Sequence, residues 1–242
     1  MSLPAPPNNP NARPEDTRAA ILRAAIAEFA EQGEAGARTD AIARAAGVNK
    51  ALLHYYYGTK DGLYGAVLDV VFTGLVDRFL KVLNGPGSHG ERLLRYFLAH
   101  FDHLTDSNPF TRLMGHELMH ARTGASTRIP KIVSICFGPL HAALCATLAE
   151  GIASGELRPQ EPGPVVLSLT GANVFYFISA PFLREIAGKE PRDPDLLARQ
   201  RVTLLDFAAS VLFSDPALGR RLAMRIHSQT PGPQVRAKGE PS

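Results

Sequence analysis

The chain contains few cysteines. There are two among 242 residues, Cys136 and Cys145, and they lie nine positions apart in a segment with helical periodicity. At a rise of ~1.5 Å per residue their separation would be roughly 13 Å, which is too long for a disulfide within one helix. The spacing therefore predicts two reduced, buried cysteines in a cytoplasmic protein, where they pack as small apolar side chains.

The chain also has no strong excess of positive or negative charge. The formal net charge is +3, and charged residues make up 20% of the chain against 45% hydrophobic residues. This composition is ordinary for a soluble globular protein. The small excess excludes a protein that binds polyanions through its total charge, so basic sites have to be sought locally.

The sequence shows no targeting segment. The N-terminal residues MSLPAPPNNPNA have neither a basic start nor an apolar run, so no signal peptide is predicted. The stretch 164–183 is free of charge over a length close to the ~20 residues that span a bilayer. It contains polar residues and a proline and has no basic flank. These features favour a buried helix of a soluble protein over a membrane span.

No segment alternates polar and apolar residues as a strand does, and no internal repeat is visible. Apolar residues recur at helical spacing instead, and Pro, Gly and Asn punctuate the runs. The pattern predicts an all-α protein. The longer helices are expected at 16–32, 61–84, 90–105, 109–122, 129–153, 163–188 and 194–214.

The stretch 38–60, RTDAIARAAGVNKALLHYYYGTK, has the pattern of two short helices joined by a tight turn. Thr39 is a suitable N-cap for the first helix. Gly47 is expected to end that helix in the left-handed conformation, which costs glycine little. Asn49 is the expected N-cap of the second helix, and Thr59 that of the long helix that follows. Helix, glycine turn and helix are typical of a helix-turn-helix.

The local charge agrees with contact to a nucleic acid. Positions 36–60 hold four cations and one acid, Asp40. In a helix-turn-helix, cations and hydroxyls at helix ends position phosphates, and the second helix enters the major groove. Lys50 is the strong base-reading candidate by charge, whereas Ala51 and Leu52 offer apolar contacts to a thymine methyl group.

The segment 17–80 closely resembles the TetR family of bacterial transcriptional regulators. The resemblance rests on the turn, the aromatic run of the second helix and the opening of the following helix. The matching positions are Gly36, Thr39, Ile42, Ala43, Ala46, Gly47, Val48, Asn49, His54, Tyr55, Tyr56, Tyr57, Lys60, Asp61, Gly62 and Leu63. The C-terminal part matches only in outline, through its helices and through pieces such as 150–158.

The resemblance implies an N-terminal three-helix helix-turn-helix domain linked to a larger C-terminal helical domain for ligand binding and dimerisation. It implies a homodimeric repressor that a small-molecule effector releases from a palindromic double-stranded DNA operator. Such a regulator is cytoplasmic and associated with the bacterial nucleoid, and we expect no enzymatic activity, cofactor or metal. The expected divisions are a disordered tail at 1–13, the DNA-binding domain at 14–76, the ligand-binding and dimerisation domain at 77–215, and a basic tail at 216–242.

Carried onto this chain, the family pattern implies seven DNA contacts. They are Thr39, Lys50, Ala51, Leu52, His54, Tyr55 and Lys60. The first and the last match positions that touch phosphate at helix N-termini, where the helix dipole favours anions. The others lie on the recognition helix. Ala51 and Leu52 depart from the glycine and the small or polar residue that are usual there. Leu53 and Tyr57, four positions apart, are expected to face the small core.

A rival motif lies further along the chain. His116, Glu117 and His120 form an H-E-x-x-H string on a predicted helix, the signature in which two imidazoles bind zinc and the glutamate activates water. A zinc-dependent hydrolase is therefore the alternative function. No third histidine follows in ARTGASTRIP, and Glu150 is the distant acidic candidate for a third ligand. The string also falls inside the domain that the resemblance assigns to ligand binding.

The C-terminal part is rich in aromatic and methionine side chains, most of which are expected in the core. A minority is expected to line a cavity for an apolar or aromatic effector, with a few polar groups to orient it. The ligand-binding candidates are Met114, Glu117, Phe137, His141, Asn173, Tyr176 and Phe177. Leu204, Phe207 and Val211 form an apolar stripe at helical spacing, which predicts a dimer interface on the last long helices.

Overall fold

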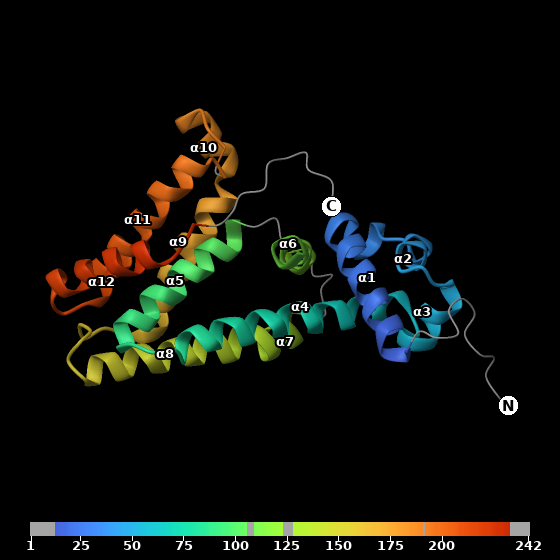
Figure 1. Ribbon diagram of the computed structural model, residues 1–242, viewed down its shortest axis with the longest axis horizontal. Coiled ribbons are helices and arrows are strands. Elements are labelled where there is room, and N and C mark those ends of the chain that lie inside the picture. Colours follow the sequence, from blue (N-terminus) through green and yellow to red (C-terminus); the bar gives the residue numbers. More distant parts are fainter. Residues whose placement is uncertain (1–12, 106–108, 123–127, 191, 233–242) are drawn as a thin grey trace. The chain divides into compact units, whose positions relative to one another are not determined.

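The structure is a computed structural model that describes residues 13–105, 109–122, 128–190 and 192–232 (Figure 1). Within these residues the regular structure is helical and no strand occurs, although one isolated antiparallel bridge pairs Leu157 with Phe213. The prediction of an all-α fold is confirmed. The tail predicted at the N-terminus and the last ten residues of the one predicted at the C-terminus lie outside the described residues, apart from Arg13.

The first four helices lie close to their predicted limits. They are α1 (Pro14–Gly36), α2 (Thr39–Ala45), α3 (Lys50–Tyr57) and α4 (Lys60–Leu83). Gly33 interrupts α1 with φ 65° and ψ 177°. The helix was predicted to end at this residue, but one more turn follows the break. A residue with a Cβ would be strained at this positive φ, which is why glycine stands there.

Two predicted helices of the C-terminal part are divided in the structure. The elements are α5 (His89–Thr105), α6 (Pro109–Arg122), α7 (Ile129–Ile132), the π-helix η1 (Val133–Phe137), α8 (Gly138–Ala153), α9 (Pro162–Ile178), α10 (Ala180–Ala187), α11 (Pro194–Leu212) and α12 (Pro216–Gln229). The run 129–153 contains a π-helical turn, and the run 163–188 bends by 65° between α9 and α10. Pro181 has no N–H to continue the helical ladder, which accounts for the bend. Residues 216–229, predicted as the start of a basic tail, form α12.

The helices form two compact units. Unit 1 holds α1, α2, α3, the part of α4 up to Leu75, and the segment with α6 and α7. In it α1 packs against α2 and α6, and α2 packs against α3. The fully buried large side chains of this unit are Ile21, Phe29, Ile42, Leu63, Tyr64 and Phe72. Those on α1 and α4 recur at helical spacing, and Ile42 of α2 adds to them, so unit 1 has a core of its own.

Unit 2 is built around α5, which packs against α8, α9, α11 and α12. α11 and α12 lie side by side (Figure 1). α5 is buried over most of its circumference, as expected of a central helix. Leu204, predicted for the dimer interface, is instead 4% exposed in a cluster with Phe101, Tyr176 and Leu197 of the same unit. Its assignment to an intersubunit stripe is therefore wrong, because its side chain is already used inside unit 2.

Both cysteines are free, as predicted. Cys136 is buried, and burial raises the pKa of its thiol to about 11, so the thiol stays protonated at neutral pH. Cys145 is only partly buried. By length and composition the run Ile129–Ala153, with mean hydropathy 1.8, would suffice to cross a membrane, and α9 with α10 would count as a second span if the bent pair were one. Core helices of soluble proteins meet the same criteria.

Candidate DNA-binding site

The turn between α2 and α3 has the predicted geometry. Gly47 has φ 68°, in the left-handed region. The side chain of Asn49 accepts a hydrogen bond from the backbone N–H of Leu52 at 3.0 Å, which caps α3. The backbone N–H of Val48 donates to the carbonyl of Ala43 at 3.0 Å and closes the turn. The sequence-predicted helix-turn-helix is therefore present.

Thr39 does not cap α2. The N-cap is Arg38, whose backbone is extended and whose side chain makes no capping bond, and Thr39 is the first helical residue. The backbone N–H of Arg38 donates to Glu28 Oε1 at 3.0 Å. This bond to α1 holds Arg38 in an extended conformation. The N-cap of α2 is therefore Arg38, one residue before the threonine that cap propensity favours. The prediction of a Thr39 cap is wrong for that reason.

α3 has one face packed against the other helices of unit 1 and another face exposed to solvent. Leu53 is 3% exposed and packs in the core, as predicted. Tyr57 is half-buried, and its hydroxyl donates to the carbonyl of Arg18 at 3.2 Å. Ala51 and Tyr55 are exposed on α3, and Tyr55 as a residue is 64% exposed. Exposed side chains next to a capped helix start are what a groove-reading helix requires.

Three candidate contacts have partners within the protein. Lys50 Nζ lies 3.0 Å from a carboxylate oxygen of Asp40, and Lys60 Nζ donates to the carbonyl of Ala35 at 3.1 Å. His54 Nδ1 lies 2.7 Å from the carbonyl oxygen of Gly58. Lysine carries three N–H donors, so one such bond does not exhaust its capacity. These bonds orient the three side chains, and the two lysines keep N–H donors that can bind DNA.

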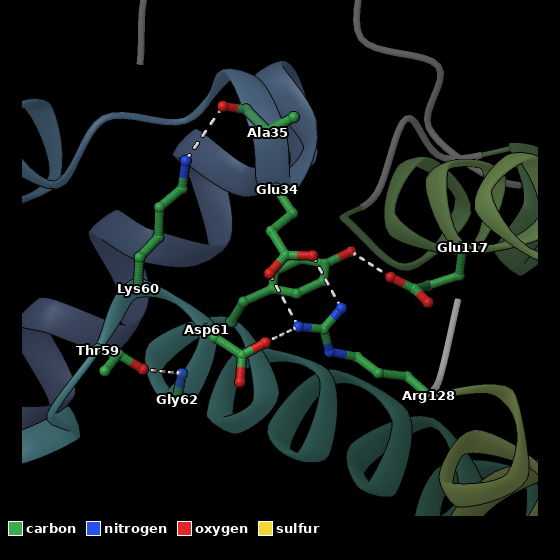
Figure 2. Close-up of polar contacts among 9 residues, drawn as sticks. Glu34, Ala35, Thr59, Lys60, Asp61, Gly62, Glu117 and Arg128 are labelled. Carbon is green, nitrogen blue, oxygen red and sulfur yellow. Dashed lines mark hydrogen bonds and ion pairs between the residues drawn. The ribbon is translucent and has the colours of Figure 1, made fainter. Parts of the chain in front are cut away.

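The start of α4 positions Lys60 (Figure 2). Thr59 Oγ1 accepts from the backbone N–H of Gly62 at 3.0 Å, which confirms the predicted cap. A Cβ on Gly62 would come within 2.4 Å of the carbonyl oxygen of Tyr57, closer than real Cβ atoms approach backbone. Glycine at this position lets the chain turn tightly from α3 into α4. The ammonium group of Lys60 can then reach the end of α1.

A charged network that the sequence did not suggest lies beside this point, within unit 1 (Figure 2). Arg128 donates two hydrogen bonds of 2.8 Å to the carboxylate of Glu34 and also contacts Asp61. Its guanidinium lies 4.8 Å from the centre of the Tyr64 ring. Arg128 and Glu34 are 94 positions apart in the chain, so no local signal could have paired them. The network ties the end of α1 to the start of α4.

Glu117, a ligand-binding candidate, takes part in this region of unit 1. It is fully buried on α6 and accepts a hydrogen bond of 2.8 Å from the hydroxyl of Tyr64. Burial, together with the carboxylate of Glu117, raises the pKa of Tyr64 well above its usual range. The phenol therefore stays protonated as the donor. Met114, partly buried on α6, belongs to the same unit.

The H-E-x-x-H string is not arranged as a catalytic centre. His116 Nε2 lies 3.4 Å from the carbonyl of Ala30, and its ring packs where a Cβ on Gly33 would stand, 3.1 Å from Nδ1. Glu117 is bonded to Tyr64. Among the side chains that the structure describes, no group of three or more His, Cys, Asp or Glu residues is placed to hold a metal ion. Nothing in the geometry supports the hydrolase alternative.

The other five ligand-binding candidates belong to unit 2. Phe137 is 42% exposed on η1, and His141 is exposed on α8 with its Nε2 3.5 Å from the sulfur of Cys145. The remaining three, Asn173, Tyr176 and Phe177, lie on α9. The seven predicted residues are thus divided between the two units.

One of the α9 candidates, Asn173, takes part in a buried polar contact. The amide of Asn173 donates to the carbonyl of Phe97 at 2.9 Å and lies 3.2 Å from His100 Nδ1. Burial, and then the charge on His103, lower the pKa of His100 to about 4, so its imidazole is neutral. A neutral ring with an acceptor at Nδ1 suits the amide donor. Neither His100 nor its pairing with Asn173 was predicted.

Tyr176 and Phe177 flank the same aromatic ring. The centre of Phe101 lies 5.4 Å from that of Tyr176 and 5.2 Å from that of Phe177. These distances are typical of favourable aromatic pairs. A hollow of about 320 Å³ between α11 and α12 adjoins this cluster at Leu197, and its lining, which includes Arg201 and His227, contains none of the seven ligand-binding candidates.

The capped turn, the buried Leu53 and the exposed face of α3 define a helix-turn-helix DNA-binding protein. Comparison with known proteins identifies the family to which it belongs. The chain belongs to the TetR family: the family model for bacterial regulatory proteins of the tetR family matches residues 21–67, and the model for a tetracyclin repressor-like C-terminal domain matches residues 90–207. Regulators of this family bind DNA operators and small-molecule ligands, function as dimers and are generally not enzymes.

Individual relatives agree with this assignment. The chain is 44% identical over 90 residues to the HTH-type transcriptional repressor SCO4008 of Streptomyces coelicolor, a match that covers 36% of this chain and 45% of that repressor. It is 28% identical over 177 residues to the HTH-type transcriptional regulator RutR of Escherichia coli, covering 72% of this chain and 80% of RutR. The chain thus spans less than half the length of the first relative and most of the second.

Solved structures show the same fold. A crystal structure of a gamma-butyrolactone receptor (ArpA-like protein) superposes with a TM-score of 0.61 at 22% identity, covering 90% of this chain and all of that one. The hemolysin II regulator HlyIIR superposes with a TM-score of 0.55 at 24% identity, covering 84% of this chain and all of that one. As a member of the TetR family the chain is a DNA-binding transcriptional regulator, and the superpositions agree with its helix-turn-helix domain and C-terminal helical domain.

Proposed function

We propose that the chain is a repressor that binds a palindromic operator as a homodimer and is released by a small apolar or aromatic effector. The main support is the exposed face of α3, where Ala51 and Tyr55 are open to solvent beside a capped helix start. SCO4008, which is 44% identical to this chain over 90 residues, is likewise a transcriptional repressor. The protein would act in the bacterial cytoplasm, held at the nucleoid by its DNA contacts.

In this proposal α3 reads bases through Lys50, Ala51 and Leu52. The apolar side chains of the last two meet thymine methyl groups, and the ammonium of Lys50 meets base acceptors in the major groove. Phosphate contacts come from Thr39 and Lys60, and His54 and Tyr55 contact the DNA backbone or the bases. Phosphate contacts set the register of the protein on the duplex, and base contacts determine the sequence.

The dimer surface proposed here is the apolar face of α9, α10 and α11. Its large side chains are each at least 42% exposed in the single chain: Leu167, Phe175, Ile178, Phe182, Ile186, Val202 and Phe207. A monomeric soluble protein rarely exposes so many large apolar side chains on neighbouring elements. Burying them against a second copy would remove them from water and set the separation of the two α3 helices.

The effector is proposed to bind in unit 2 near Tyr176 and Phe177. Aromatic side chains dominate there, and Asn173 with His100 supplies the few polar atoms. Such a lining selects an apolar or aromatic molecule with one or two polar groups. Phe137 and His141 are left out of this site, because His141 lies beside Gly163 in the first turn of α9, roughly 20 Å along the helix from Tyr176.

Selection of bound fragments from a genomic DNA pool tests the proposed function. We expect enrichment of a palindrome whose half-sites lie one helical turn, roughly 34 Å, apart or a multiple of that distance. Release of the enriched DNA is then measured with a panel of small aromatic and aliphatic molecules. A pool without any enriched sequence would refute the operator, tight binding by a monomer would refute the dimer, and operator binding that no molecule weakens would refute the effector.

A further inference from the structure

An ion pair joins the two helices of the helix-turn-helix. Lys50 Nζ lies 3.0 Å from Asp40 Oδ1 and 3.1 Å from Oδ2. Lys50 is the first residue of α3, and Asp40 is the second residue of α2. Both side chains are open to water, with 48% and 66% of their surfaces exposed. The pair therefore lies on the outer surface of the motif.

A negative charge is unexpected on the proposed DNA-binding surface. Asp40 is the one acid among positions 36–60, and Lys50 is the one lysine or arginine of α3. A carboxylate near DNA repels phosphates, and an exposed ion pair adds little to stability. An acid in the first turn of a helix also interacts favourably with the helix dipole. That interaction requires a carboxylate on α2, and it requires no contact with Lys50.

We propose that Asp40 is a specificity-determining residue that acts together with Lys50, which rests on the proposed role of α3 in reading DNA. The pair combines an ammonium donor with a carboxylate acceptor about 3 Å apart. A G·C base pair presents the complementary set in the major groove, since guanine offers O6 and N7 as acceptors and cytosine offers an N4 amino donor. We assign the pair to one G·C position in each half-site.

The same pairing lowers binding to DNA of arbitrary sequence. A lysine that is neutralised by Asp40 gains less from a phosphate than a free lysine does, because its counter-charge remains beside it. At the matching base pair both members find a partner in the groove. Asp40 thus increases the ratio of operator binding to non-specific binding, even though it adds a negative charge to the surface.

Four proteins test this role: wild type, Asp40→Asn, Lys50→Ala and the double variant. Each is titrated with the selected operator, with operators changed at each G·C position, and with a random-sequence duplex of equal length at several salt concentrations. We expect Asp40→Asn to bind the random duplex about threefold more tightly, with a salt slope steeper by about one. Its operator-to-random ratio falls about tenfold, and one G·C position loses its preference. In the Lys50→Ala background the same substitution has much less effect.

Three further variants complete the design. Asp16→Asn removes an exposed acid from the first turn of α1 and reports the effect of net charge alone. Asp40→Glu keeps the carboxylate and is expected to retain most of the specificity ratio. Asp40→Ser is a second neutral variant with a residue suited to a helix start. Circular dichroism establishes that each protein is folded at the assay temperature.

The outcomes are distinct. An unchanged ratio in both neutral variants overturns the role of Asp40, as does an equal effect of Asp16→Asn or an undiminished effect in the Lys50→Ala background. In each of these cases the wild type still selects an operator, so the proposed function survives. A wild type that prefers no sequence overturns the proposed function and this role with it.

Discussion

Among single residues, the cations proposed for DNA contact also bond within the protein. Lys60 donates to the carbonyl of Ala35 near the end of α1, where the negative end of the helix dipole favours a cation. Lys50 is paired with Asp40. Each lysine therefore contributes to the shape of the motif as well as to its charge, and the two contributions can be separated by experiment.

Lys60→Ala is expected to weaken binding to all duplexes alike and to reduce the salt slope by about one, because a phosphate contact releases about one counterion. Removal of the bond to Ala35 should also lower stability by about 0.5–1.5 kcal/mol. Binding is measured against salt by fluorescence anisotropy, and stability by urea unfolding. Lys81→Ala, at an exposed lysine in the last turn of α4, is the control and should leave the slope unchanged. An unchanged slope in Lys60→Ala would remove Lys60 from the DNA contacts.

His100 should make unit 2 sensitive to acid. Burial, and then His103, lower its folded-state pKa to about 4, whereas an unfolded histidine titrates near 6.5. The resulting stability is fully present above pH ~6.5 and is lost as the pH falls towards 4, since the unfolded chain binds the proton first. We expect unfolding free energy to drop by about 2 kcal/mol between pH 7 and pH 5.

Urea titrations at several pH values measure this effect. His100→Gln should remove most of the pH dependence, whereas His141→Gln, at an exposed histidine of α8, should leave it intact. Equal pH dependence in His100→Gln and wild type would show that other groups cause the acid sensitivity.

At the level of elements, local capping determines where the DNA-reading helix begins. Asn49 accepts from the backbone of Leu52, and Gly47 supplies the left-handed turn before it. These interactions join residues close in sequence, so they were predicted correctly. Thr39 shows the limit of such reasoning, because a bond from Glu28 of α1 moved the helix start by one residue.

Asn49→Ala should destabilise α3 by about 1 kcal/mol, the usual cost of losing an N-cap side chain. Operator affinity should fall as well, because α3 then has to be ordered on binding. Asn49→Ser retains a capping oxygen and should behave like the wild type. Thermal unfolding and operator titration measure the two effects. Equal stability of the alanine and serine variants would mean that the cap contributes nothing.

At the level of the whole molecule, α9, α10 and α11 leave an apolar face without a partner in the single chain. Ile178, Phe182 and Ile186 are 66%, 70% and 82% exposed. The stripe predicted on α11 is only partly available for a dimer interface, since Leu204 is buried whereas Phe207 is 51% exposed. The interface was predicted on the last two long helices, 163–188 and 194–214, and within them the proposed surface lies mainly on the bent pair α9 and α10.

Ile178→Glu should place a charge in the centre of that interface and produce monomers, because an unpaired buried charge is strongly unfavourable. Operator affinity should drop by at least tenfold, since two half-sites can no longer be bound together. Sedimentation velocity and operator titration give the two results. Gln229→Glu, at an exposed position on α12, is the matched control and should remain dimeric. A dimeric Ile178→Glu protein would place the interface elsewhere.

The sequence by itself determined the all-α fold, the helix-turn-helix and the family, because helical periodicity, caps and glycine turns act between neighbours in the chain. Only the tertiary structure decided which side chains meet. Asp40 with Lys50, Tyr64 with Glu117 and Glu34 with Arg128 are 10, 53 and 94 positions apart. Contacts of this kind depend on how helices pack, and a local pattern carries no information about them. The same reason explains why the seven ligand-binding candidates proved to be divided between two units.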